Sequence, residues 1–407
     1  MMSGAKKRVP KRRFKEFLNA GDWEQYKLAD ILSRRKENRR IDSAYPRLAF
    51  AAGQGVIPLS ERRTNNRDQL ISDEKNKKYL VTYYNDIVYN PANLKYGAID
   101  RNKYGQGVIS PIYVTFTSNI CSGFIEHIVK SHEFKEKALS FEEGTVTKRQ
   151  AVNPDNLLKI DVVITPNSKE QEKISKLFEL IDRFITLHQH KLYKLEATKK
   201  ALLQEMFPEK GQDKPKRRFK GFTDAWEQRK LSDITEIVMG QSPSSKNYTD
   251  NPNDNILVQG NADLKDGKVV PRLWTKEITK TIDKDGIILT VRAPVGDVAR
   301  TDYKVVLGRG VAGIKGNDYI YQFLQKLQNN RYWVSLSSGS TFESINSNDI
   351  KDLIIDIPSI EEQTKISMLL NNVNSIITLH QRKLDKLKNL KQAYLNEMFV
   401  SRRVCYE

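Results

Sequence analysis

Clusters of basic and amide side chains are the groups in this chain best suited to chemistry. The first half offers Arg34, Arg35, Lys36, Asn38, Arg39, Arg40, Arg62, Arg63, Asn65, Asn66 and Arg67. The second half offers Gln241, Ser242, Ser244, Ser245, Lys246, Asn247, Tyr248, Gln259, Asn261, Arg292 and Arg309. Guanidinium and ammonium groups contact phosphates, and Arg, Asn and Gln can pair bidentately with purine edges. Ordinary polar turns are the alternative for any single residue, whereas the clusters as sets predict contact with double-stranded DNA.

Catalytic motifs are missing from the same sequence. No Gly-x-Gly-x-x-Gly run follows a strand, and residues 308–315 are glycine-rich but break the phosphate-loop pattern. Residues 90–93 read Asn-Pro-Ala-Asn, which lacks the second proline and the aromatic residue of an adenine methyltransferase motif. We therefore expect no catalytic residue, no metal ligands and no cofactor bound by this chain. A stand-alone DNA methyltransferase or nuclease, and a coiled-coil adaptor, remain the alternatives.

Composition narrows the partners and the compartment. The chain has 407 residues and a formal charge of +18, which favours a polyanionic partner over a merely soluble surface. No apolar run reaches the roughly 18 residues that a membrane span needs, so we expect no membrane partner. Cys121 and Cys405 are the only cysteines and cannot form a disulfide framework. A reducing, cytoplasmic setting is therefore expected.

The elements that must position these clusters occur twice. A basic arm at residues 11–17 returns at 216–222, and the Trp-Glu-Gln that begins at Trp23 returns at Trp226. Later blocks repeat as well: Thr-Leu-His-Gln at 186 and 378, and Glu-Met-Phe at 205 and 397. Between them lie two segments that differ strongly but share short β-rich runs, and residues 85–88 align with 285–288. The pattern predicts two mixed α+β domains on a common frame, each with one helical stretch, at 124–137 and 318–333.

Two long helices are predicted from a seven-residue apolar repeat that is typical of coiled coils. Pro166 and Pro358 precede their starts, and Ser168 is a plausible cap for the first. Their seam and partner-docking positions are Ile174, Phe178, Ile181, Ile185, Leu187, His188, Leu192, Leu195, Leu202, Met206, Ile366, Leu370, Val373, Ile377, Leu379, His380, Leu384, Leu387, Tyr394 and Met398. The two histidines are interpreted as polar seam residues that fix the register. Metal ligation and simple surface exposure are the alternatives.

These residues together resemble the specificity subunit of type I restriction–modification enzymes. The resemblance rests on residues 217–231, on the proline followed by Glu-Gln at 166–171 and 358–363, and on Leu-Leu-Gln-Glu-Met-Phe at 202–207. It covers nearly the whole chain. The first copy departs from it at residues 18–22, where Leu-Asn-Ala-Gly-Asp replaces Thr-Asp-Ala, and this affects only the local turn.

The resemblance implies an α+β fold with two target-recognition domains, separated by two long antiparallel coiled-coil helices in pseudo-two-fold symmetry. Each domain would read half of a split DNA sequence. The helices would dock two modification subunits, which use S-adenosylmethionine, and restriction subunits that use ATP and Mg would join through those. The expected boundaries are a basic arm (1–22), the first recognition domain (23–165), the first helix (166–210), a linker that repeats the arm (211–225), the second domain (226–357), and the second helix with its tail (358–407).

Overall fold

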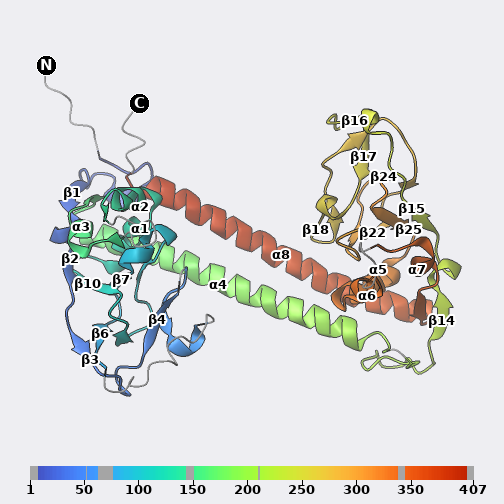
Figure 1. Ribbon diagram of the computed structural model, residues 1–407, viewed down its shortest axis with the longest axis horizontal. Coiled ribbons are helices and arrows are strands. Elements are labelled where there is room, and N and C mark those ends of the chain that lie inside the picture. The colour runs from blue at the N-terminus through green and yellow to red at the C-terminus, as the bar shows by residue number, and fades with distance from the viewer. Residues whose placement is uncertain are drawn as a thin grey trace. The chain divides into compact units, whose positions relative to one another are not determined.

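The computed structural model describes residues 8–51, 53–62, 77–143, 151–209, 211–337 and 344–400. The chain divides into two compact units: Met1–Leu187 with Leu384–Glu407, and His188–Lys383. Each unit combines sheets, short helices and parts of both long helices, α4 (Ser168–Glu205) and α8 (Ile360–Met398) (Figure 1). The expected mixture of helix and sheet is therefore confirmed.

Local sequence explains where the long helices begin. The Asn167 side chain accepts hydrogen bonds from the backbone N–H groups of Lys169 and Glu170, so Asn167 caps α4. The cap expected at Ser168 was wrong by one residue, because Ser168 is already the first helical residue. At the start of α8, the Ser359 hydroxyl accepts from the Glu362 N–H at 3.3 Å.

The first unit, called unit 1 below, contains a four-stranded sheet, a three-stranded sheet and three strand pairs. The four-stranded sheet has the order β2 (Leu32–Arg34), β10 (Val114–Ser118), β7 (Ile87–Tyr89), β8 (Ile99–Arg101). The other groups are β3 (Asn38–Arg39), β6 (Tyr79–Thr82) and β9 (Gly107–Ile109); β4 (Leu48–Ala51) with β5 (Gly55–Pro58); β1 (Glu24–Lys27) with β13 (Asp161–Ile164); and β11 (Glu142–Glu143) with β12 (Ala151–Val152). Its short helices are α1 (Ser122–Val129), α2 (His132–Leu139) and α3 (Pro154–Leu158).

The second unit, unit 2, has larger sheets among its described residues. One has the order β15 (Ile237–Met239), β25 (Val311–Ile314), β22 (Ile287–Thr290), β23 (Val298–Arg300), β19 (Lys268–Val269), β18 (Leu264–Lys265). Another has the order β16 (Tyr248–Thr249), β20 (Trp274–Thr275), β17 (Asn255–Val258), β24 (Val305–Leu307), β21 (Thr281–Ile282). β14 (Glu227–Lys230) pairs with β26 (Ile354–Ile357), and the short helices are α5 (Asp318–Asn329), α6 (Tyr332–Ser337) and α7 (Ser347–Lys351).

The two units repeat the same local geometry where the sequences were aligned. Asn85 and Asp285 both have left-handed φ angles, of 75° and 68°. Their N–H groups donate to the carbonyls of Asn102 and Thr301, each at 2.8 Å. The single helical stretches expected at 124–137 and 318–333 were wrong, because each is two helices. In unit 1 the Ser131 hydroxyl caps α2 by accepting from the Phe134 N–H, which starts a new helix there.

Each unit takes the end of a long helix into its core. In unit 1, Phe399 lies 5.4 Å from Phe124 and 6.1 Å from Trp23, between ring centroids. In unit 2, Phe207 lies 5.1 Å from Tyr319 and 6.4 Å from Trp226. The Met-Phe block that ends the first helix therefore packs beside the second tryptophan, and the last block of the chain packs beside the first. Within each unit the parts of α4 and α8 run antiparallel.

Candidate nucleic-acid interface

Three glycines allow the loops of unit 2 to meet closely. A Cβ on Gly240 would collide with the carbonyl oxygen of Gly308, and a Cβ on Gly310 would collide with that of Gln259. The loop after β15, the loop after β17 and the turn between β24 and β25 therefore pack backbone against backbone. The Gly240 N–H donates to Val311 O at 3.0 Å, and the Gly308 N–H donates to Val258 O at 2.8 Å. These bonds join the three loops into one surface, called the glycine platform below, which sequence reasoning did not foresee.

Several predicted contact residues lie on this platform. The Arg309 N–H donates to the Ser242 hydroxyl at 3.0 Å, and the Gln241 N–H donates to Leu307 O at 2.8 Å. The Gln259 amide donates to the Tyr248 hydroxyl at 2.8 Å. The side chains of Gln241, Gln259 and Arg309 are exposed. Amide and guanidinium groups are thus presented together from three loops, an arrangement that suits hydrogen bonding to base edges and phosphates.

Other candidates in unit 2 mainly stabilise the surrounding loops. The backbone of Ser244 and the side chain of Asn247 both donate to Glu277, at 2.8 and 2.7 Å. Asn261 donates to Asp297. Three more candidates are exposed: Ser245, Lys246 and Arg292.

In unit 1 the basic and amide residues along β2 and β3 differ in exposure and therefore in what they can contact. The exposed members of this basic run are Arg34, Lys36, Asn38, Arg39 and Arg40. Arg35 is half-buried, donates to both carboxylate oxygens of Asp86 at 2.9 and 3.0 Å, and lies 4.5 Å from the Tyr83 ring. Arg35 therefore ties the run to the turn before β7, which sequence clustering alone did not distinguish.

Two tyrosines beside this run, Tyr45 and Tyr83, were not in the predicted set. Arg39 donates to Glu37 at 2.8 Å and lies 4.4 Å from the Tyr45 ring. The Tyr83 and Tyr45 hydroxyls are 3.0 Å apart, and Tyr83 also donates to Glu37. The hydrogen bond to Tyr45, burial and the Glu37 charge raise the pKa of Tyr83 to about 12, so it remains a donor. Tyr45 follows the arginine run closely in the sequence, which was an available signal, whereas Tyr83 lies far along the chain and gave none.

Four candidates lie outside the described residues: Arg63, Asn65, Asn66 and Arg67. Arg62 is described, and its N–H donates to Leu59 O at 3.1 Å.

The structure places the predicted helix seam inside each unit. The fully buried members are Ile174, Phe178, Ile181, Leu384 and Met398 in unit 1, and Leu192, Met206, Ile366 and Leu370 in unit 2. The partly exposed members are Ile185, His188, Leu195, Leu202, Val373, Ile377, His380, Leu387 and Tyr394. By contrast, Leu187 and Leu379 are 44% and 50% exposed.

The two seam histidines meet within unit 2. Nδ1 of His188 lies 2.8 Å from Nδ1 of His380, so one ring donates and the other accepts when both are neutral. Burial and the proximity of His188, Lys191 and Lys383 lower the pKa of His380. Across the described ranges, no group of three or more His, Cys, Asp or Glu residues could hold a metal ion. The register role of the pair stays a prediction.

The repeated Glu-Gln motif holds each basic arm and a short helix to a long helix. Glu170 accepts two hydrogen bonds from Arg13 at 2.6 and 2.8 Å, and Glu362 accepts two from Arg218 at 2.8 and 2.9 Å. Gln171 accepts from the Cys121 N–H at the start of α1. In unit 2 the equivalent Gln363 accepts from Asn317, which caps α5. The sequence revealed the motif, and the contacts explain why it occurs twice.

No helix in the described part of the chain is both long and apolar enough to cross a membrane.

The comparisons with known proteins agree with this architecture. Residues 223–389 match the family described as type I restriction modification DNA specificity domain. A similar curated protein is the putative type I restriction enzyme MjaX specificity subunit of Methanocaldococcus jannaschii, 26% identical over 275 residues. That match covers 65% of this chain and 64% of the relative, so the chain spans slightly less than two thirds of its length.

Two solved structures share the fold. The type I restriction–modification S subunit from M. genitalium is 14% identical, with a TM-score of 0.65, over 97% of this chain and 99% of that one. A chain from work on complex assembly and conformational transition of the type I R-M system is 20% identical, with a TM-score of 0.54, over 93% and 97%. At these identities the likeness concerns the fold. Together with the family match over residues 223–389 and the curated relative, it shows that the chain is similar to specificity subunits of type I restriction–modification systems.

Proposed function

We propose that this chain is the DNA-recognition subunit of a type I restriction–modification complex and that each unit reads one half of a bipartite, asymmetric target. The observation that carries the proposal is a shared frame with different exposed loops. Both units repeat the arm clamp, Arg13 with Glu170 and Arg218 with Glu362. They nevertheless present different polar surfaces, a basic strand run in unit 1 and the glycine platform in unit 2. The same frame can thus present two different readers.

The proposal extends to the arrangement of the readers. Two target-recognition domains would be separated by an antiparallel coiled coil in pseudo-two-fold symmetry. The antiparallel packing inside each unit supports this, as does the repetition of helix-end contacts by Phe399 and Phe207. Helix length would then set the number of unread base pairs between the half-sites.

Exposed apolar residues on the long helices support partner docking. Phe184 and Leu187 on α4 are 43% and 44% exposed, and Ile376 and Leu379, 192 residues later on α8, are 44% and 50% exposed. Matched apolar positions on both helices fit two copies of one partner, the modification subunit, with restriction subunits joining through it. The chain itself would be non-catalytic and cytoplasmic. S-adenosylmethionine, ATP and Mg would be bound by the partners.

A domain exchange tests the proposal. Residues 226–357 are replaced by the equivalent segment of a homologue, and methylated adenines are mapped in cells that carry the chimera and its modification partner. One half-site should change while the other persists. A simultaneous change in both halves would contradict independent reading, and S-adenosylmethionine binding by the isolated chain would favour a stand-alone enzyme instead.

Single substitutions test the platform itself. Arg309→Ala should weaken binding of the assembled complex by about 1–3 kcal/mol and relax one position of the second half-site if Arg309 reads a base. If it contacts a phosphate, binding should weaken for all sequences and the salt slope should flatten. Arg229→Ala is the matched control, because Arg229 is exposed in the same unit but lies on β14. Equal effects of the two changes would exclude the platform as the reading surface.

A further inference from the structure

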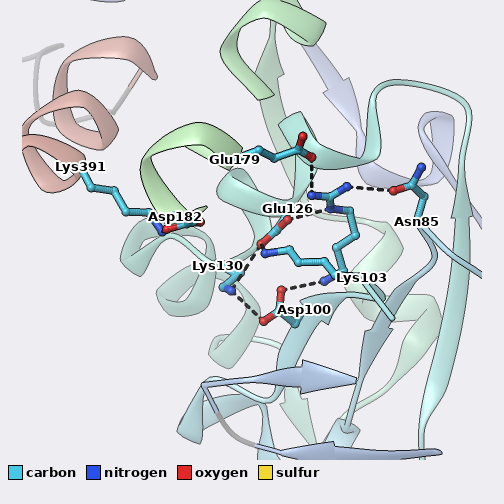
Figure 2. A network of polar contacts seen from close by, with 9 residues as sticks. Asn85, Asp100, Lys103, Glu126, Lys130, Glu179, Asp182 and Lys391 are labelled. Atoms are coloured by element: carbon cyan, nitrogen blue, oxygen red, sulfur yellow. Dashed lines mark hydrogen bonds and ion pairs between the residues drawn. The ribbon is translucent and has the colours of Figure 1, made fainter. Parts of the chain in front are cut away.

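A buried charge network joins the four-stranded sheet of unit 1 to two helices. Figure 2 shows it around Glu126, with Asn85, Asp100, Lys103, Lys130 and Glu179. Its centre is Arg101, the last residue of β8, whose side chain is only 6% exposed. The three guanidinium nitrogens donate to three elements: Nε to Glu126 on α1 at 2.8 Å, Nη1 to Asn85 at 2.8 Å, and Nη2 to Glu179 on α4 at 2.6 Å.

The network balances its charges internally. Lys103 and Lys130 also contact Glu126, at 2.5 and 3.5 Å, and Lys130 contacts Asp100 at 2.8 Å. Burial alone would raise the pKa of Glu126, but the two lysines outweigh it and lower the pKa to about 2. Glu126 therefore stays ionised, and it keeps two cationic partners even without Arg101.

The Arg101–Glu179 contact adds a second directional link to α4, beside the hydrogen bond from the Cys121 N–H to Gln171, and the neighbouring packing is close or apolar. At Gly123, α1 approaches α4 so closely that a Cβ would collide with the Ser175 hydroxyl. Beside it, Phe178 packs against His127 and Phe399. Apolar contacts of this kind are non-directional, so they do not by themselves fix how the sheet and α1 are rotated relative to α4. A planar guanidinium with donors in fixed directions does fix this rotation, because it holds the sheet, α1 and α4 at the same time.

Unit 2 makes the corresponding connection between a sheet, a short helix and a long helix with different side chains. Arg300 ends β23 as Arg101 ends β8, donates to Asp285 O at 2.8 Å, and contacts Asp318 on α5 at 2.8 Å. Asp318 accepts from Asn371 on α8, which in turn accepts from Gln322. Asn371 lies 192 residues after Glu179 and takes its place on the long helix. Two chemistries for one connection indicate that the connection itself is retained.

We propose that Arg101 and Glu179 are positioning residues, which hold the first recognition sheet at a set orientation on α4 and so limit which half-site spacings the complex accepts. The spacing part rests on the proposed function. The orientation part concerns unit 1 alone. Glu179→Gln is the sharpest test, because the Glu179 side chain is 47% exposed and its replacement buries no unpaired charge. Glu172→Gln is the matched control, since Glu172 lies on the same helix and contacts only Lys176, at 3.7 Å, among the described ion pairs.

Orientation is measured first, without DNA. Spin labels are placed at the exposed positions 96 and 183 of the full chain in complex with its modification partner, with Cys121 and Cys405 replaced by serine. Glu179→Gln should broaden the distance distribution between the labels, while Glu172→Gln leaves it unchanged. Arg101→Lys keeps the positive charge near Glu126 but cannot bridge three elements, so it should broaden the distribution as well. Thermal unfolding checks that each variant is folded.

Spacing is measured second, with duplex libraries that carry both half-sites and spacers of varied length. Glu179→Gln should reduce the preference for the best spacer over spacers one base pair longer or shorter by about threefold, with the same bases read. Unchanged label distances and unchanged spacer preference in both Glu179→Gln and Arg101→Lys would overturn the inference. If the variants broaden the label distances but the wild-type complex shows no spacer preference, the proposed function is overturned. The orienting role of Arg101 and Glu179 in unit 1 is then still supported.

Discussion

Replacing His127 by phenylalanine should make unit 1 less sensitive to acid. His127 lies on α1, half-buried against Phe178, with ring centroids 4.4 Å apart. Burial lowers the pKa of His127 to about 4, and the positive charges of Lys391 and Lys103 act in the same direction. The negative charges of Glu126 and Asp182 raise the pKa and offset part of this shift. The matching position in unit 2, six residues after the N-cap residue of α5, is Phe323, so phenylalanine is already used in the second copy.

The magnitude follows from proton linkage. An unfolded histidine has a pKa of about 6.5, so between that value and about 4 only the unfolded state takes up the proton. The stability supplied by neutral His127 is therefore complete above about pH 7 and is lost as the pH falls. Between pH 8 and pH 5 the loss amounts to about 2 kcal/mol. Below pH 4.5 Glu126 adds a loss of the same sign, whereas Asp100, whose pKa is raised by burial, acts in the opposite sense.

The assay is urea unfolding at pH 8, 6.5 and 5, read by hydrogen-exchange pulses at one fixed pH and mass spectrometry. Peptides from α1 and from the sheets of unit 1 report its free energy of unfolding. The wild-type value should fall by about 2 kcal/mol more than that of His127→Phe across this range. His132→Gln is the control, because the His132 side chain is 77% exposed. An equal pH dependence of His127→Phe and the wild type would refute the reasoning.

Three further outcomes are expected. Phe399→Ala should destabilise unit 1 by about 2–4 kcal/mol in urea unfolding, because it empties an aromatic cluster, and should leave unit 2 peptides unchanged. Asn374→Asp should stabilise unit 2 by about 0.5 kcal/mol and raise the Lys199 pKa, measured by NMR titration. The reason is that burial lowers the Lys199 pKa, while the equivalent Lys391 in unit 1 has Asp182 as its partner. Leu379→Glu should prevent co-purification of the modification subunit without changing thermal unfolding; retained co-purification would contradict docking at this face.

Much of the fold could be predicted from local pattern. The duplication, the long helices and most of the seam follow from periodicity, because a helix positions residues three, four and seven apart on one face whatever surrounds it. The buried state of Phe178 and Leu370 agrees with that reading. The apolar pattern continues through residues 124–137 and therefore predicts one helix. The structure has two helices there, because the Ser131 hydroxyl caps the start of the second.

The candidate surfaces were predictable as sets but not residue by residue. Arg35 and Arg39 look equivalent in the sequence, yet Arg35 is held by Asp86, 51 residues away, while Arg39 stays exposed. The glycine platform of unit 2 joins loops that are up to 70 residues apart, and no local rule connects them.

The sequence by itself determined that there are two copies of one frame, two amphipathic helices and two different polar loop sets. Those features depend on residue type and short-range spacing. Only the tertiary structure decided that Phe399 completes unit 1, that Phe207 completes unit 2, and that Arg101 joins a sheet to α4. These contacts depend on which distant surfaces are complementary in shape and charge, and such complementarity exists only once the chain has folded.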